Sequence, residues 1–152
     1  MSPVLVIGYG NPSRRDDGVG HYVVEKVERL AGGSVNTLAL HQLGPELAET
    51  IKDYDLVIFV DAHSGEYPER LRVASIEAVY RPSAFTHFMS PNSLLALAKS
   101  LYHKEPQAFS VSVRGYDFDF GTELSAETHR WADIAVERIL EMVGVRREDG
   151  LN

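Results

Sequence analysis

Unbroken apolar runs alternate with amphipathic segments along this chain. Residues 4–7 and 56–60 are continuous apolar runs, which are typical of strands buried on both faces of a parallel sheet. Apolar residues then recur at helical spacing between residues 19 and 30, and Gly32 and Gly33 end that pattern. The chain therefore begins with a strand, a glycine-containing turn and a helix.

The rest of the chain continues this alternation. We expect strands at residues 35–40, at 71–75 on a sheet edge, and at 109–113, the last half exposed because apolar residues and serines alternate there. Further helices are predicted to start with Pro45 in their first position and after the N-caps Ser90 and Ser125.

The order βαβαββαβα predicts an α/β fold, a three-layer α/β/α sandwich around a mostly parallel, twisted sheet. The length of 152 residues favours a single domain spanning residues 1–152, with a frayed tail at 146–152.

Carboxylates follow two of the predicted parallel strands. Asp16 and Asp17 lie where the first helix begins, and Asp61 ends the run at 56–60. Because the carboxyl ends of parallel strands meet at one edge, we expect a shared crevice, where repulsion calls for a cation or a proton between the acids. Adjacent aspartates do not face one point, so either Asp16 or Asp17 is expected to be a helix cap or a solvated charge. Asp61 has the alternative interpretation of a turn residue.

His87, three residues before Ser90, is the third candidate ligand, with a hydrogen-bonded surface histidine as the alternative. Two carboxylates and one imidazole suit zinc, nickel, manganese or iron, but they lack the fourth ligand of a closed structural zinc site. His63, two residues after Asp61, is a reserve ligand or a supporting group. Four other histidines are interpreted as surface or hydrogen-bonded residues: His21, His41, His103 and His129.

Composition excludes several function classes. The chain has no cysteine, which excludes thiol catalysis, zinc–cysteine sites and disulfides. A net charge of −7 disfavours nucleic acid as a partner and suits a metal cation or a basic peptide. No apolar stretch is long enough to span a bilayer, and the first strand starts at the N-terminus, so we expect a cytoplasmic protein with no signal peptide and no membrane partner.

Other glycine-rich motifs fit the opening segment poorly. Gly8 and Gly10 match the first two glycines of a dinucleotide-binding turn, but Ser13 stands at the third glycine position, and no acid ends the second strand. The sequence also contains neither a G-x-S-x-G elbow nor a phosphate-binding Gly-Lys-Ser/Thr run.

Four segments together resemble the hydrogenase maturation endopeptidases, which trim the C-terminus of the large subunit of nickel–iron hydrogenases. The segments are GYGNPSRRDDGVG, VIFVDAHSG, THFMSPNSLLALAKSLY and VSVRGYDFDFGTELS. The resemblance implies an α/β/α fold and a catalytic metal site at Asp17, Asp61 and His87, with the second acid of the Asp16-Asp17 pair as the ligand. Two departures are Ser13, where the family often carries a larger apolar residue, and the adjacent Arg14-Arg15.

The resemblance also implies a partner, the hydrogenase large-subunit precursor, which supplies the nickel that the protease recognises. Another divalent cation is expected to fit the site of the isolated protein. The implied chemistry is peptide hydrolysis, in which the metal polarises a carbonyl or activates water. We expect a monomer. A non-catalytic, nickel-dependent binding or checkpoint protein of hydrogenase assembly is the alternative function.

Overall fold

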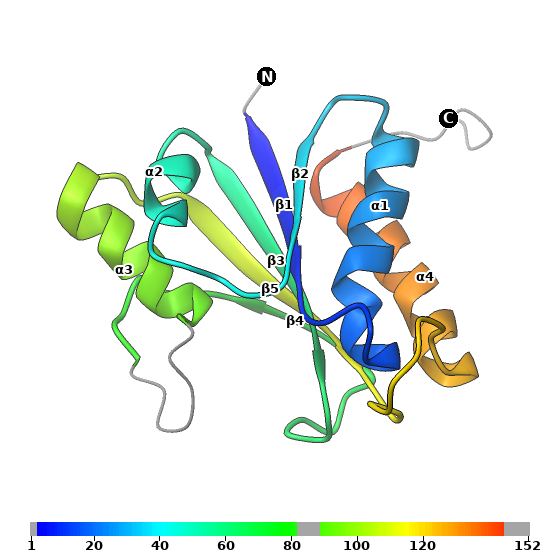
Figure 1. Cartoon of the computed structure of the whole chain (residues 1–152). Coiled ribbons are helices and arrows are strands. Elements are labelled where there is room, and N and C mark those ends of the chain that lie inside the picture. Colours follow the sequence, from blue (N-terminus) through cyan, green and yellow to red (C-terminus); the bar gives the residue numbers. More distant parts are fainter. Residues whose placement is uncertain (1–2, 82–88, 145–152) are drawn as a thin grey trace.

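Five strands form one sheet in the order β2-β1-β3-β5-β4 in the computed structural model, which describes residues 3–81 and 89–144 (Figure 1). β4 runs antiparallel to β5, and the other neighbouring pairs are parallel. The strands are β1 (Val4–Tyr9), β2 (Asn36–Leu40), β3 (Leu56–His63), β4 (Leu71–Ser75) and β5 (Gln107–Arg114). The α-helices are α1 (Val19–Ala31), α2 (Leu47–Ile51), α3 (Pro91–Tyr102) and α4 (Ala126–Met142). A short 3₁₀ helix, η1 (Arg15–Gly18), precedes α1.

Helices cover both faces of the sheet (Figure 1). α1 and α4 pack on one face, against inward residues such as Val6, Ile58 and Val111. α2 and α3 pack on the other face, against alternate residues such as Leu5 and Val57. Both faces of the central strands are thus buried, as their continuous apolar runs predicted. The α/β/α class, the mostly parallel sheet and the edge position of 71–75 are confirmed.

The connections place a topological switch between β1 and β3. From β1 the chain passes through α1 to β2 on one side, and it then crosses to β3 on the other side of β1. Ligands of open α/β sheets bind in the crevice at the carboxyl ends of the strands flanking such a switch. Here those ends are Tyr9 and the segment from Asp61 to His63.

Several local predictions were wrong. β3 continues through Asp61, which pairs in register with Ser112 and is therefore not a turn residue. β5 is more buried than expected, because helices pack on both faces of the sheet, and its residues 111–113 are buried. Pro45 precedes the N-cap Glu46 of α2 and is not in its first turn.

Other expectations about the chain have simpler outcomes. Ser90 caps α3 as predicted, accepting a hydrogen bond from the Ser93 N–H at 3.1 Å. The expected frayed tail lies outside the described residues. Among residues 3–81 and 89–144, no helix combines the length and the apolar character needed to cross a bilayer.

Two glycines let α1 start directly against the sheet. A Cβ atom on Gly8 would lie 2.2 Å from the Gly20 carbonyl oxygen, and one on Gly20 would lie 2.7 Å from the Val60 carbonyl oxygen. These atoms belong to the backbone, so a side chain at either position would push the helix away from β1 and β3. The contact therefore sets the height of the helix above the strand ends.

We predict that Gly8→Ala destabilises the protein by about 2–3 kcal/mol, because the added methyl group overpacks a backbone contact. Gly32→Asn is the control, because Gly32 has a φ of 62° and open space around its Cα, and asparagine tolerates that conformation. Urea unfolding monitored by circular dichroism measures both. Equal stability of the Gly8→Ala variant and the wild type would contradict the contact.

Candidate functional site

The turn after β1 holds the carboxylate of Asp17. Gly10 has a φ of 141°, and a Cβ atom there would lie 2.2 Å from the Asp17 carbonyl oxygen, so only glycine fits. The next backbone N–H, from Asn11, donates to Asp17 Oδ2 at 2.7 Å. The glycine-containing turn therefore wraps around Asp17 and orients its side chain.

Asp61 reaches the same place from β3. The Tyr9 hydroxyl donates to Asp61 Oδ2 at 3.2 Å. Burial raises the pKa of Asp61 to about 6; hydrogen bonds from Ser112 and Tyr9 act in the opposite direction, while the charges of Glu66 and Asp17 raise it further. Burial, followed by the charge of Asp61, also raises the pKa of Tyr9 well above its usual value, so Tyr9 stays a hydrogen-bond donor.

Asp17 and Asp61 line one cavity of about 250 Å³ at the switch between β1 and β3. The wall is made of residues at or just after the carboxyl ends of β1, β2 and β3, together with Met89 before the start of α3. They are Tyr9, Gly10, Asn11, Asp17, His41, Gln42, Leu43, Asp61, Ala62 and Met89. The crevice expected from parallel strand direction is therefore present, and the two carboxylates share it.

The histidine that the structure places at the cavity is not the one that the sequence favoured. His87 lies in the segment 82–88, outside the described residues. In the part of the chain that is described, no three histidine, aspartate or glutamate side chains cluster closely enough to hold a metal. His41, which was interpreted from the sequence as a surface or hydrogen-bonded residue, lines the cavity. The topological argument used for Asp61 would have identified it, because His41 directly follows β2.

His63 does not line the cavity, and burial lowers its pKa, so it is neutral at physiological pH. It is 4% exposed, and neither ring nitrogen has a hydrogen-bond partner among the described residues. Its ring packs edge-on against Tyr67, with centroids 5.2 Å apart. His63 is therefore not among the residues that the structure brings to the cavity of Asp17 and Asp61.

Asp16 faces away from the cavity and is fully buried. Its carboxylate accepts hydrogen bonds from the backbone N–H groups of Tyr116 (2.8 Å), Asp117 (2.9 Å) and Ser125 (2.7 Å). The hydroxyls of Ser125 (2.7 Å) and Thr128 (2.9 Å) also donate to it. Neither acid of the pair is the cap of α1 or the solvated charge that the sequence led us to expect.

The pKa of Asp16 is lowered. Burial acts to raise it, but the combined hydrogen bonds from Ser125, Tyr116 and Asp117 outweigh that effect. Ser125 is the N-cap residue of α4, as predicted, but its side chain makes no capping hydrogen bond. Its hydroxyl donates to Asp16 instead, so the Asp16 carboxylate joins η1 to the start of α4.

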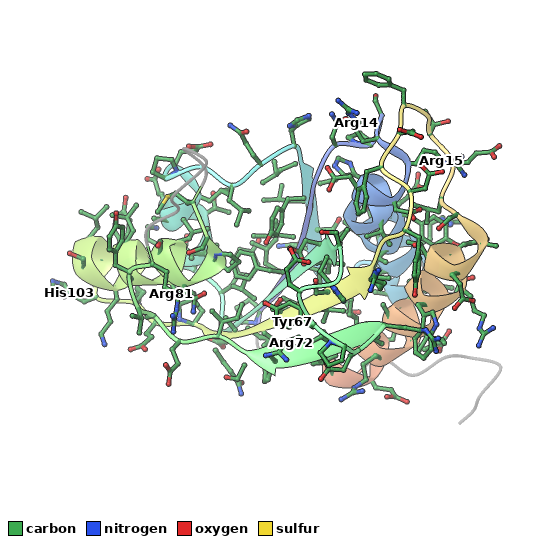
Figure 2. The ribbon with its side chains drawn as sticks, turned by 90° about the horizontal axis from the view of Figure 1, so that it is seen from below. Arg14, Arg15, Tyr67, Arg72, Arg81 and His103 are labelled. Carbon is green, nitrogen blue, oxygen red and sulfur yellow. The ribbon has the colours of Figure 1, made fainter. Side chains whose placement is uncertain are left out.

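Further contacts hold η1 against the loop between β5 and α4. The Arg15 N–H donates to the Gly121 carbonyl and the Gly121 N–H to that of Ser13, both at 2.9 Å. The Arg15 guanidinium lies 3.2 Å from the Asp117 carboxylate. Figure 2 shows Arg14 and Arg15 beside this loop, with the Arg14 guanidinium 4.1 Å from the centre of the Phe120 ring. The YDFDFG segment is thus the outer support of the turn that carries Asp17.

His21 supports the cavity from the α1 side. Its Nε2 atom lies 2.9 Å from the Gly10 carbonyl oxygen and 3.0 Å from the Leu40 carbonyl oxygen. Both oxygens are acceptors, so Nε2 carries a proton. The Gly10 N–H also donates to the Leu40 carbonyl at 3.1 Å. His21 therefore ties together the two turns that bear Asn11 and His41.

Comparison with solved structures identifies the same architecture in other proteins. The hydrogenase maturating endopeptidase HybD from Escherichia coli superposes with a TM-score of 0.76 at 22% identity, covering 93% of this chain and 92% of that one. The [NiFe] hydrogenase maturation protease HycI from Thermococcus kodakarensis gives 0.75 at 21% identity, covering 94% and 93%. A hydrogenase 2 maturation peptidase from a Thaumarchaeota archaeon gives 0.70 at 24% identity, covering 95% and 99%.

The chain has the fold of the hydrogenase maturation endopeptidases. The resemblance seen in four short segments of the sequence thus extends to the whole architecture. No family model and no curated protein sequence matches the chain.

We predict that Asp61→Asn stabilises the metal-free protein by ~1–3 kcal/mol at pH 7.5, because Asp61 has a pKa of about 6 when folded and an ordinary aspartate pKa of 3.8 when unfolded. The folded state binds the proton more tightly, so the ionised carboxylate costs stability as the pH rises from 3.8 to 6. The gain should fall to about a third of that value at pH 4.5, and it disappears only below the unfolded pKa. Urea unfolding at both pH values tests this, and equal effects at the two would contradict it.

Asp16→Asn is predicted to destabilise the protein by ~2–4 kcal/mol at pH 7.5, since an amide places N–H donors against the donors around Asp16. Because the folded pKa is lowered, the contribution of Asp16 is complete above the unfolded pKa and disappears as the pH falls through the folded one. Asp119→Asn, on the exposed part of the same loop, is the control. Thermal unfolding of the two variants should differ clearly at pH 7.5.

Proposed function

We propose that this protein is an endopeptidase of the hydrogenase maturation family that removes a C-terminal peptide from the nickel-loaded large-subunit precursor of a nickel–iron hydrogenase. The observation that carries the proposal is the shared cavity of Asp17 and Asp61 at the switch between β1 and β3. It lies in a fold whose solved examples are named as maturation proteases. The protein would act as a cytoplasmic monomer without nucleic acid or membrane partners.

The donor set at the cavity suits a cation brought by the substrate. One oxygen of each carboxylate is oriented by this chain, Asp17 by the Asn11 N–H and Asp61 by the Tyr9 hydroxyl. Carboxylate oxygens with an imidazole suit nickel and related divalent ions, and three ligands leave positions open for groups of the precursor. We propose His87 as that third ligand.

The electrostatics of the cavity also favour a cation. The Asp17 charge contributes to the raised pKa of Asp61, so a divalent ion between the two carboxylates would relieve their repulsion and favour the ionised form of Asp61. The ion would then lie beside a peptide bond of the precursor and polarise its carbonyl or activate a water molecule. The chain offers no cysteine as an alternative nucleophile.

Incubation with a nickel-loaded large-subunit precursor tests the activity, and mass spectrometry detects the released C-terminal peptide. The wild-type protein should shorten the nickel-loaded precursor and leave the nickel-free precursor intact. A precursor that is bound but uncut, under conditions where a known maturation protease cuts it, would replace the proposal with a non-catalytic checkpoint function.

Asp17→Ala, Asp61→Ala and His87→Ala are each predicted to reduce processing by more than the roughly 10–100-fold that loss of an outer supporting group costs. The Asp17 and Asp61 variants should remain folded, because each removes a carboxylate at the wall of a cavity. His63→Ala should have a milder effect. Asp53→Ala is the control, since Asp53 is exposed after the end of α2, does not line the cavity and pairs only with Lys52 among the described residues. Full cleavage by any of the first three variants would remove that residue from the site.

A further inference from the structure

A groove of about 910 Å³ lies beside the cavity and takes no part in the proposed chemistry. Its floor is formed by the outer side of β2 and the exposed face of α1. The loop residues Thr122, Glu123 and Leu124 close its other side. The groove therefore runs from the free edge of the sheet toward the loop that supports Asp17.

The edge strand in this groove is open for pairing. Within the described residues β2 pairs only with β1, and Figure 1 shows it at the border of the sheet next to α1. The Leu40 carbonyl accepts a hydrogen bond from the turn after β1, so the peptide groups of Leu40 face inward. Because this direction alternates along a strand, the N–H and C=O groups of Thr37 and Ala39 face outward.

Nothing in the sequence of β2 blocks this edge. Edge strands are usually protected by a charged residue, a proline or a bulge. The other edge strand, β4, carries the charged residue Arg72. β2 has the sequence NTLAL, with neither a charge nor a proline. An extended peptide could thus pair with it as an added strand.

The charges around the groove are unbalanced. Three glutamates line it: Glu25, Glu28 and Glu123. Glu28 accepts a hydrogen bond from the Thr37 hydroxyl at 3.0 Å, and Glu25 and Glu123 are exposed carboxylates without an ion-pair partner among the described residues.

The basic residues that line the groove are already engaged. Arg15 pairs with Asp117, and His21 donates to backbone carbonyls. His129 lies 2.9 Å from the Tyr22 hydroxyl and 3.6 Å from Asp133. The free charge that the groove presents is therefore negative and complements a cationic ligand.

The groove and the cavity share their walls. Asn11 and Asp17 line the cavity, while their neighbours Pro12 and Gly18 line the groove. The bonds of His21 to the carbonyls of Gly10 and Leu40 lie between the two spaces. A chain extended along β2 would therefore lead directly to the two carboxylates.

We propose that the groove binds an extended segment of the precursor that carries lysine or arginine side chains, paired as a sixth strand on the outer edge of β2. This proposal rests on the proposed function, because it assigns the docking site of the same substrate. The backbone groups of Thr37 and Ala39 hold the segment, and Glu25 and Glu123 bind its cationic side chains. The cavity receives the part of the precursor that is cut.

The test compares two double variants with the same change in net charge. Glu25→Lys with Glu123→Lys reverses the charge of the groove, and Glu49→Lys with Glu141→Lys places the same charges on α2 and at the end of α4, away from it. Processing rates are measured against the concentration of nickel-loaded precursor. The groove variant should raise KM about tenfold with kcat nearly unchanged, and the control should remain near the wild type.

A second arm measures binding directly. A labelled synthetic peptide with the sequence of the C-terminal segment of the precursor is titrated with the wild-type protein and with both double variants at low and high salt. The groove variant should bind about tenfold more weakly at low salt, and the difference should shrink at high salt. Ala39→Pro, which removes one outward N–H, should also weaken binding, with thermal unfolding as the check on its fold.

The outcomes separate the two proposals. A wild-type protein that leaves the precursor uncut overturns the proposed function. A wild-type protein that cuts the precursor, together with equal KM values and equal peptide affinities for the two double variants, overturns the groove as the docking site. An equal loss in both double variants would assign the effect to net charge and would also overturn it.

Discussion

The buried carboxylate of Asp16 is the interaction on which the site depends. It joins the turn after β1 to the loop between β5 and α4, segments about a hundred residues apart in the chain. Five donors surround it, three from the backbone and two from hydroxyls. A carboxylate with this many partners is stable as an anion in the interior, and removal of its charge would leave those donors unsatisfied. Because Asp17 follows directly, its position is set by a neighbour that has no contact with the cavity.

Asp16 and Asp61 show how the environment divides the roles of carboxylates. Both are removed from water, and burial acts to raise both pKa values. Hydrogen bonds overcome that effect at Asp16 but not at Asp61, which keeps a pKa of about 6. A bound cation stabilises the ionised form of a carboxylate at a cavity wall that lacks enough hydrogen-bond donors. A carboxylate already surrounded by donors is not stabilised further by such an ion. Asp16 therefore suits a structural role, and Asp61 suits a binding role.

Much of the fold could be predicted from the sequence because the strong signals were local. Continuous apolar runs identified β1 and β3, and the shared direction of parallel strands predicted one crevice for Asp61 and an acid of the Asp16-Asp17 pair. The choice between Asp16 and Asp17 needed either the family resemblance or the structure. No local pattern reveals donors contributed by residues 116–128.

The errors have a common physical cause, because each assigned a residue by its own preference when a distant segment decided its role. Ser125 occupies the predicted N-cap position of α4, but its hydroxyl donates to Asp16 and not to the helix backbone. The alternation in β5 indicated an exposed face, but helices cover both faces of the sheet and residues 111–113 are buried. His41 lacks a local motif and was interpreted as a surface or hydrogen-bonded residue, although it follows β2 at the same sheet edge as the carboxylates.

The fold separates rigid and open regions in a way that suits a protein substrate. Around Asp17, backbone contacts, buried hydrogen bonds and the close approach of Gly10 leave little freedom, as a site that orients a reacting bond requires. Beside it, β2 keeps an unprotected edge that most sheets would block. An exposed edge strand carries a risk of aggregation. A protein retains such an edge more readily where a partner pairs with it. The open edge and the fixed carboxylates meet at the His21 contacts, so a peptide held by one would be delivered to the other.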